Sequence, residues 1–215
     1  MADVTLARLG VIAEQRWGLF TTAQAATVGI ARKQLSRMAA AGAIERVAHG
    51  VYRMAGAPSV GHETIYATWL ALGGATAPRA DTGVPALVAA GTTAATVHGI
   101  GDFLLDELDY IVPARKGTRL PGVRLRIRRL APDDVLPVDG LPTLTVERTI
   151  ADLVDLGTDM SLVAGTVRDA VRAGKLLSAD RLAEHLDVIG RRTGCEVAAD
   201  LFELSGIRPE GFRGD

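Results

Sequence analysis

The chain has 215 residues, of which 48% are hydrophobic and 23% are charged, and its formal net charge is −1. This composition is ordinary for a globular protein and excludes a largely disordered chain. The longest weakly polar stretch, 86–100, is interrupted by polar residues and glycines. It falls short of the roughly 20 apolar residues that a membrane span needs. We therefore expect a soluble protein with no membrane partner. Its single cysteine, Cys195, cannot form an internal disulfide, which fits a reducing cytoplasm but also a secreted protein without disulfides. Because the first residues lack the pattern of a signal peptide, we expect a cytoplasmic protein.

Residues 1–57 predict three helices followed by a hairpin. Apolar residues at helical spacing indicate a helix over about 5–17, a short helix over 22–26 and a third helix over 31–41, which Gly42 ends. Two apolar runs, 44–47 and 51–54, flank a glycine-containing turn and predict a β-hairpin. This order is that of a winged helix-turn-helix, in which the hairpin is the wing.

The third predicted helix has an apolar face and a polar face that suits the major groove of DNA. Leu35, Met38 and Ala39 fall on the packing face. On the other face, arginine can bind guanine, glutamine can bind adenine, and lysine and serine can reach phosphates. Basic residues of the hairpin would lie along the DNA backbone or the minor groove, and two threonines at a helix N-terminus could hold a phosphate. The candidate DNA-binding residues are Thr21, Thr22, Arg32, Lys33, Gln34, Ser36, Arg37, Arg46, His49 and Arg53.

Charge is distributed unevenly along the chain. Residues 1–57 hold seven basic and three acidic side chains, whereas the remainder holds 17 basic and 22 acidic ones. A basic N-terminal part followed by an acidic remainder is consistent with a chain of which one part binds a polyanion. The alternatives are that the basic helix face is merely solvated, or that the winged helix binds a protein.

Residues 62–205 predict a second domain, with a small mixed α/β core and a C-terminal helical bundle, so the predicted fold class is α+β. A flexible tail is expected over 206–215. Helices are predicted over 62–72, 92–98, 146–156, 161–173, 179–190 and 195–204. Strands are predicted over 108–112 and 123–130, with a second hairpin, 136–138 and 141–144, that its prolines confine to a sheet edge.

The stretch 110–130 contains seven basic residues and no acidic residue. On a strand, its arginines would alternate with Val123, Leu125 and Ile127 and point to the opposite face. This second candidate basic surface comprises Arg115, Lys116, Arg119, Arg124, Arg126 and Arg128. It could extend a DNA footprint or contact an anionic partner. Alternatively, it is a solvated face paired with acidic residues such as Asp102, Asp106, Glu107 and Asp109.

The sequence contains no recognisable catalytic constellation. Its three lysines, Lys33, Lys116 and Lys175, are each preceded two residues earlier by alanine, where a restriction-type nuclease has Glu or Gln. A phosphate-binding loop and a dinucleotide fingerprint are also lacking, and Cys195 has no neighbour at metal-ligand spacing. We therefore expect no enzymatic activity, no cofactor and no metal.

Several polar residues of the rear half have structural explanations. His98 precedes a glycine and is interpreted as a capping or buried histidine. Glu147 lies on the first turn of a predicted helix, where it favours the helix dipole. On the same helix, Arg148 can pair with Asp152 at i, i+4.

Several motifs together resemble AbiEi-type antitoxins. In the front half they are GLFTTAQA at 18–25, IARKQL at 30–35 and GAIERVAHGVYR at 42–53. In the rear half they are GTTAATVHGI at 91–100, DGLP at 139–142 and TVERTIADL at 145–153, which relatives with a nuclease-like domain share. The resemblance covers roughly residues 10–157.

This resemblance implies a transcriptional autorepressor that is also the antitoxin of a type IV toxin–antitoxin pair. The winged helix would bind inverted repeats of double-stranded DNA in its own promoter. The second domain would neutralise a nucleotidyltransferase-like toxin, directly or indirectly. Two other hypotheses are a winged-helix repressor unrelated to a toxin, and a protein-interaction adaptor that does not bind DNA.

Overall fold

The computed structural model describes residues 2–59, 61–77 and 79–207. It confirms the α+β class. The chain divides into two compact units, Met1–Ala77 and Pro78–Asp215. The sequence placed the boundary at 57–62, before helix α4 (Glu63–Ala71). The structure assigns α4 to the first unit, where Glu63 forms an ion pair with Arg53.

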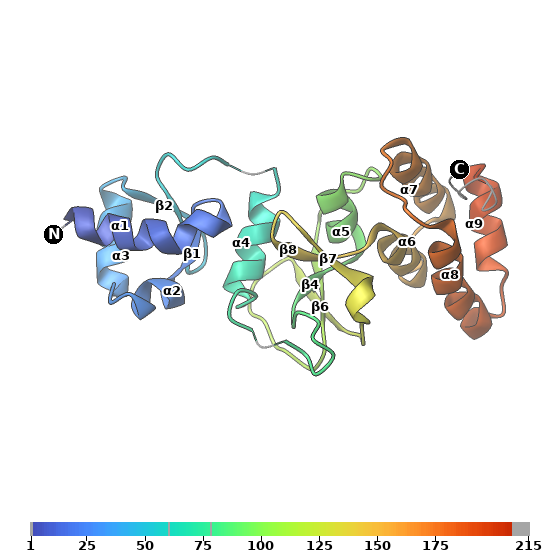
Figure 1. The fold of residues 1–215 in the computed structure, drawn as a ribbon, viewed down its shortest axis with the longest axis horizontal. Coiled ribbons are helices and arrows are strands. Elements are labelled where there is room, and N and C mark those ends of the chain that lie inside the picture. Colours follow the sequence, from blue (N-terminus) through green and yellow to red (C-terminus); the bar gives the residue numbers. More distant parts are fainter. Residues whose placement is uncertain (1, 60, 78, 208–215) are drawn as a thin grey trace. The chain divides into compact units, whose positions relative to one another are not determined.

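The first unit combines helices with a small antiparallel sheet (Figure 1). Its elements in chain order are α1 (Ala2–Ala13), a 3-10 turn (Glu14–Arg16), β1 (Leu19–Thr21), α2 (Thr22–Thr27), α3 (Arg32–Ala40), β2 (Ile44–Ala48), β3 (Val51–Met54) and α4. The strand order is β1-β3-β2, and β3 is antiparallel to both neighbours. The predicted helices and hairpin are present, whereas the three-residue β1 was not predicted.

Apolar residues from the helices and the sheet form one core in this unit. Leu9 of α1, Phe20 of β1, Leu35 of α3 and Ile44 of β2 are completely or almost completely buried. The rings of Phe20 and Tyr52 stack at 5.9 Å between centroids. This core fixes which face of α3 points outward.

The second unit is built on a five-stranded sheet with the order β6-β5-β4-β8-β7. The strands are β4 (Val88–Ala89), β5 (Leu108–Val112), β6 (Val123–Ile127), β7 (Val135–Val138) and β8 (Leu141–Leu144). β5 and β6 are parallel, as are β4 and β8, whereas β4–β5 and β7–β8 are antiparallel. Of the predicted proline-containing hairpin, β7 lies at a sheet edge and β8 lies inside the sheet.

Five helices complete this unit: α5 (Gly91–His98), α6 (Val146–Asp155), α7 (Met160–Arg172), α8 (Ala179–Thr193) and α9 (Val197–Ser205). The four C-terminal helices lie together beside the sheet (Figure 1). Their shared core includes Ile150, Val163, Leu182 and Leu201, all fully buried. Along the described ranges, no helix is both long and apolar enough to span a membrane.

The predicted tail, 206–215, falls largely outside the described residues, which end at 207. Gly206 ends α9 with a φ of 71°. Ile207 packs against the helical core and donates its N–H to the Phe202 carbonyl oxygen at 3.2 Å.

Candidate nucleic-acid interface

Helix α3 presents a basic face to solvent. Leu35 is fully buried and Met38 and Ala39 pack against the same core, so the opposite side of the helix faces outward. Arg32, Lys33 and Arg37 are exposed there, together with Ser36. Among the described residues of the first unit, the ion pairs all involve Arg53, so these three cations have no carboxylate partner within the unit.

Two polar residues of α3 bond to the helix itself. The Gln34 Oε1 accepts the N–H of Ala31 at 2.8 Å, and the Ser36 hydroxyl donates to the Arg32 carbonyl oxygen at 3.2 Å. A bidentate bond from glutamine to adenine needs that carbonyl oxygen. Gln34 would therefore have to give up its bond to the backbone to read a base, and its role at DNA stays a prediction.

The turn between β2 and β3 brings two further candidates together. Arg46 and His49 are both exposed, and Arg46 Nη2 lies 3.5 Å from His49 Nδ1. The register of the hairpin shifts between Arg46 and Ala48. This places two polar side chains side by side at the end of the hairpin.

Arg53 differs from the other candidates, because its guanidinium already forms ion pairs with carboxylates. It forms ion pairs with Glu45 of β2 and Glu63 of α4, and its side chain is only 16% exposed. The hydrogen bond to Glu45 raises the pKa of this guanidinium, Glu63 raises it further, and burial lowers it. We therefore withdraw Arg53 from the predicted interface. Its role is to join β2, β3 and α4, which the sequence missed because Glu63 was assigned to another domain.

The two threonines at the start of α2 also have partners within the unit. The Thr21 Oγ1 accepts the N–H of Gln24 at 3.1 Å, and Gln24 Oε1 accepts the N–H of Thr21 at 2.8 Å. Thr22 donates its N–H and its hydroxyl to the Gly50 carbonyl oxygen, at 2.8 and 3.3 Å. These bonds fix the start of α2 against the β2–β3 turn, and a phosphate contact here stays a prediction.

Four of the predicted residues line one hollow of about 280 Å³: Thr21, Thr22, Arg32 and His49. Its remaining wall includes residues between Leu70 and Thr76, at and after the end of α4. The sequence assigned α4 to the second domain and gave no signal that this segment borders the candidate interface.

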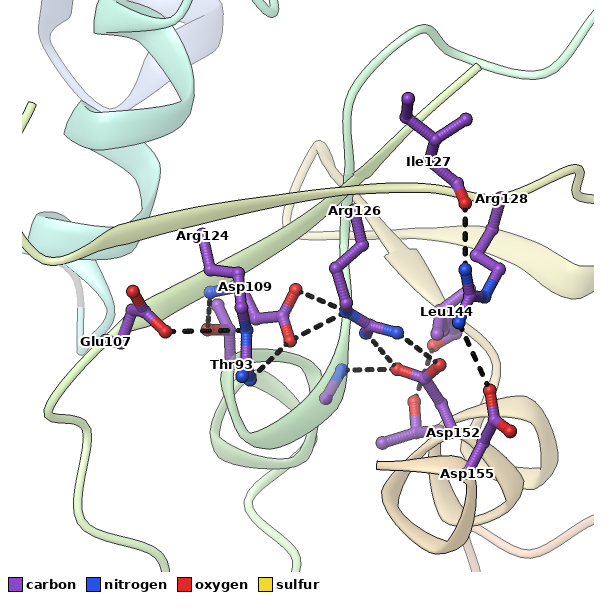
Figure 2. Close-up of polar contacts among 12 residues, drawn as sticks. Thr93, Glu107, Asp109, Arg124, Arg126, Ile127, Arg128, Leu144, Asp152 and Asp155 are labelled. Carbon is purple, nitrogen blue, oxygen red and sulfur yellow. Dashed lines mark hydrogen bonds and ion pairs between the residues drawn. The ribbon is translucent and has the colours of Figure 1, made fainter. Parts of the chain in front are cut away.

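In the second unit, Arg126 lies between two buried aspartates (Figure 2). Its Nε is 2.9 Å from Asp109 Oδ1, and its Nη1 is 2.9 Å from Asp152 Oδ1. Both carboxylates are fully buried and the arginine side chain is 10% exposed. Burial alone would lower the pKa of Arg126, but its bonds to Asp152 and Asp109 raise it. The arginine is therefore a fixed internal cation.

Backbone groups extend this network to α5. Asp152 accepts the N–H of Gly91 at 3.0 Å, and the N–H of Asp109 donates to the Thr93 hydroxyl at 2.8 Å. Gly91 has a φ of +53°, and a Cβ there would lie 2.9 Å from Asp109 Oδ2. The network thus joins β5, β6, α5 and α6, and it requires glycine at the start of α5.

In the second candidate basic surface, the two arginines of β6 and Arg128 just after it are therefore paired with acidic residues. Arg124 pairs with Asp109 at 2.9 Å and Glu107 at 3.4 Å, Arg126 is internal, and Arg128 lies 3.6 Å from Asp155. The alternative of pairing with Glu107 and Asp109 is confirmed. Arg115, Lys116 and Arg119 are exposed as predicted.

The predicted pair between Arg148 and Asp152 is also wrong. Asp152 points toward the sheet and bonds to Arg126, an arginine that lies 26 residues away in the sequence. Spacing on one helix gave no indication of this partner, because the sheet that covers the α6 face is formed by other segments.

His98 is buried, as the sequence suggested, whereas Glu147 has a contact with the start of another helix that the sequence did not predict. His98 Nε2 lies 2.7 Å from the Leu144 carbonyl oxygen, and burial lowers the pKa of the imidazole. Glu147 Oε1 accepts the N–H groups of Leu177 and Ser178 at 2.7 and 3.1 Å. Within the described part of the chain, no group of three or more potential ligands could hold a metal.

Comparison with known proteins supports the resemblance found in the front half. Residues 12–55, from the end of α1 to just beyond β3, match the family described as "Transcriptional regulator, AbiEi antitoxin". The crystal structure of the RV2827C protein from Mycobacterium tuberculosis has a similar fold, with a TM-score of 0.56 and 17% identity. That alignment covers 95% of this chain and 78% of the other. None of the curated proteins matches the chain.

Proposed function

We propose that the first unit is a winged helix-turn-helix that binds double-stranded DNA. In this proposal α3 enters the major groove, and the β2–β3 hairpin is the wing. The order of helices and strands, the β1-β3-β2 sheet and the family match over 12–55 support it. The observation that carries it is the exposed face of α3, where Arg32, Lys33 and Arg37 lack carboxylate partners within the described first unit.

The residues divide by chemistry between base reading and backbone contact. Arg32 and Arg37 can form bidentate bonds to guanine, whereas Lys33 and Ser36 suit phosphates. Arg46 and His49 suit the DNA backbone beside the wing. The nine residues of α3 span about 14 Å at 1.5 Å per residue, a length that suits recognition of a few base pairs.

In the full proposal the chain is a transcriptional autorepressor and the antitoxin of a type IV toxin–antitoxin pair. The DNA is its own promoter, at inverted repeats, and the toxin is a nucleotidyltransferase-like protein that the chain neutralises directly or indirectly. The match to the AbiEi antitoxin regulators supports this role. It covers the DNA-binding segment, so the antitoxin role rests on the wider resemblance of the rear motifs.

The DNA part is tested by mobility shift with a duplex from the gene's upstream region and a shuffled duplex of the same composition. We expect the upstream duplex to bind more tightly, and Arg32→Ala to cost about 1–3 kcal/mol and to relax base preference. Arg46→Ala should instead reduce the log–log salt slope by about 0.9, the value for one lost phosphate contact. Equal binding of both duplexes would reject the repressor.

The antitoxin part is tested by co-expression with the adjacent gene. If that gene arrests growth and this chain relieves the arrest, the antitoxin role is supported. Arrest that persists despite normal DNA binding would leave a repressor that is unrelated to a toxin. The two experiments can therefore reject the DNA-binding role and the antitoxin role separately.

A further inference from the structure

A cavity of about 500 Å³ lies at the carboxyl ends of the parallel strands β5 and β6. Its lining comes from three segments: residues between 80 and 85, 111 and 114, and 128 and 130. Val84, Ile111 and Leu130 give it an apolar wall that belongs to the core of the sheet. Small-molecule sites have volumes of about 300–1,000 Å³ and favour the carboxyl ends of parallel strands.

The segment 79–85 forms a hydrogen-bonded wall of this cavity. Ala80 donates its N–H to the Val84 carbonyl oxygen at 2.8 Å, and Gly83 donates to Ala80 at 2.8 Å. Arg79 Nη1 bonds to the Gly83 carbonyl oxygen at 2.6 Å. The cavity is thus bounded on this side by a tight turn.

One unpaired cation lines this cavity, and three more lie in the loop that begins at its wall. Of the seven basic residues between 110 and 130, those of β6 and its end (Arg124, Arg126 and Arg128) are bonded to carboxylates. The other four are exposed and form no ion pair with any described residue: Arg115, Lys116, Arg119 and Arg129.

These four cations differ in how they relate to the cavity. Arg129 lines it, as does the ion-paired Arg128, and the loop that carries the other three follows the lining residue Ala114. Asp81 is the single acidic residue of the described lining. The second unit as a whole has 17 basic and 21 acidic residues, so its net charge is negative. The segment that carries these cations is basic in spite of this.

We propose that this cavity binds a small organic phosphate, with a nucleoside phosphate as the representative ligand. The base and sugar would lie against the apolar wall, and the phosphates would meet Arg129 and, at the rim, Arg115 and Lys116, which directly follow the lining residue Ala114. A DNA duplex is too wide to enter a recess of this volume, whereas a small ligand uses both its apolar wall and its cationic rim. This ligand site is separate from the proposed DNA interface and does not depend on it.

The probe is ATP carrying a fluorescent N-methylanthraniloyl group, titrated with the full-length chain. We expect saturable binding of one probe per chain. Arg129→Ala should raise Kd about tenfold or more, the effect of losing one charge-assisted hydrogen bond. Thr82→Asp, which adds an anion to the exposed rim, should also raise Kd, whereas Asp81→Asn should lower it.

The matched control is Arg172→Ala, because Arg172 is an exposed arginine on α7 that does not line the cavity. Circular dichroism establishes that each variant is folded. An effect of Arg129→Ala no larger than that of Arg172→Ala would overturn the proposal, as would the absence of saturable binding.

Competition distinguishes a built site from a general attraction for anions. Unlabelled ATP should displace the probe at a concentration about tenfold lower than tripolyphosphate, which carries similar charge but has no apolar part. Equal displacement by tripolyphosphate would overturn the proposal, because the apolar wall would then contribute nothing. Displacement by a short DNA duplex at equal phosphate concentration would overturn it in favour of a second DNA contact.

Discussion

Replacing Arg126 with methionine tests whether the buried ion network holds the second unit together. Methionine has a similar length and no charge, so Asp152 would lose its ion pair and keep the N–H of Gly91. Asp109 would keep its bond to Arg124, which is a partly exposed arginine. Two fully buried carboxylates would then share much less positive charge.

The expected cost follows from this burial. Removing one partner of a buried ion pair typically costs about 3–5 kcal/mol, because the remaining charge stays in a poorly solvated site. Water cannot easily replace the guanidinium, since both carboxylates are fully buried. For a unit of this size, such a loss corresponds to a Tm about 10 °C lower.

The assay is urea unfolding followed by two signals. Both tryptophans of the chain, Trp17 and Trp69, lie in the first unit, so tryptophan fluorescence reports on that unit. Far-ultraviolet circular dichroism reports mainly on α5–α9, because these helices contain most of the helical residues. Arg126→Met should shift the circular dichroism transition more than the fluorescence transition.

The matched control is Arg172→Met, which breaks an ion pair with Asp169 at 3.1 Å. Arg172 is 77% exposed, and surface pairs contribute at most about 1 kcal/mol. A loss below about 1 kcal/mol for Arg126→Met, equal to that of the control, would refute the structural role of the network.

Three further changes test other parts of the account. Arg53→Met should lower the free energy of unfolding by about 1–2 kcal/mol in the fluorescence transition, because it leaves two carboxylates without their cation. Thr21→Ala should cost about 1 kcal/mol in the same transition, because it removes the cap of α2. Burial holds the pKa of His98 below its ordinary value of 6.5, so the unfolded chain binds more protons below that pH and stability falls as the pH drops below about 6.5. His98→Gln keeps a donor toward the Leu144 carbonyl oxygen and should make this fall less steep, as measured by urea unfolding between pH 7 and pH 5.

Two of these changes have a comparison within the chain. His49→Gln makes the same exchange at an exposed histidine and is the control for the substitution itself. Thr118→Ala removes a hydroxyl from a loop of the second unit and should leave the fluorescence transition in place. A pH profile of His98→Gln identical to that of the wild type would contradict the assignment of His98.

The sequence predicted the long elements of the fold and missed the short ones. The nine helices of the described residues follow the predicted positions, because each has apolar residues at helical spacing or clear end signals. β1 and β4 have three and two residues, too few for a periodic pattern, and they exist through pairing with distant strands. The assignment of α4 to the second domain failed because a helix pattern does not identify the surface that covers it.

The charged residues show the same distinction between local pattern and distant contact. Alternation along β6 correctly placed the arginines on one face, but it did not show that Arg126 on this face is internal. Arg126 points inward to two aspartates, whereas Ile127 is 52% exposed. The exposed face of α3 was predictable because it depends on one helix and its own core. Arg53 was misassigned because its partners come from two other elements.

The central claim is that α3, and not the β3–α4 side of the first unit, meets DNA. Anisotropy of a labelled upstream duplex measures this directly with Arg37→Ala and Arg53→Met, under conditions in which both variants are folded. We predict that Arg37→Ala weakens binding by about 5- to 150-fold, or 1–3 kcal/mol, and that Arg53→Met changes it by less than about twofold. Equal effects of the two changes, or a larger effect of Arg53→Met, would contradict the account.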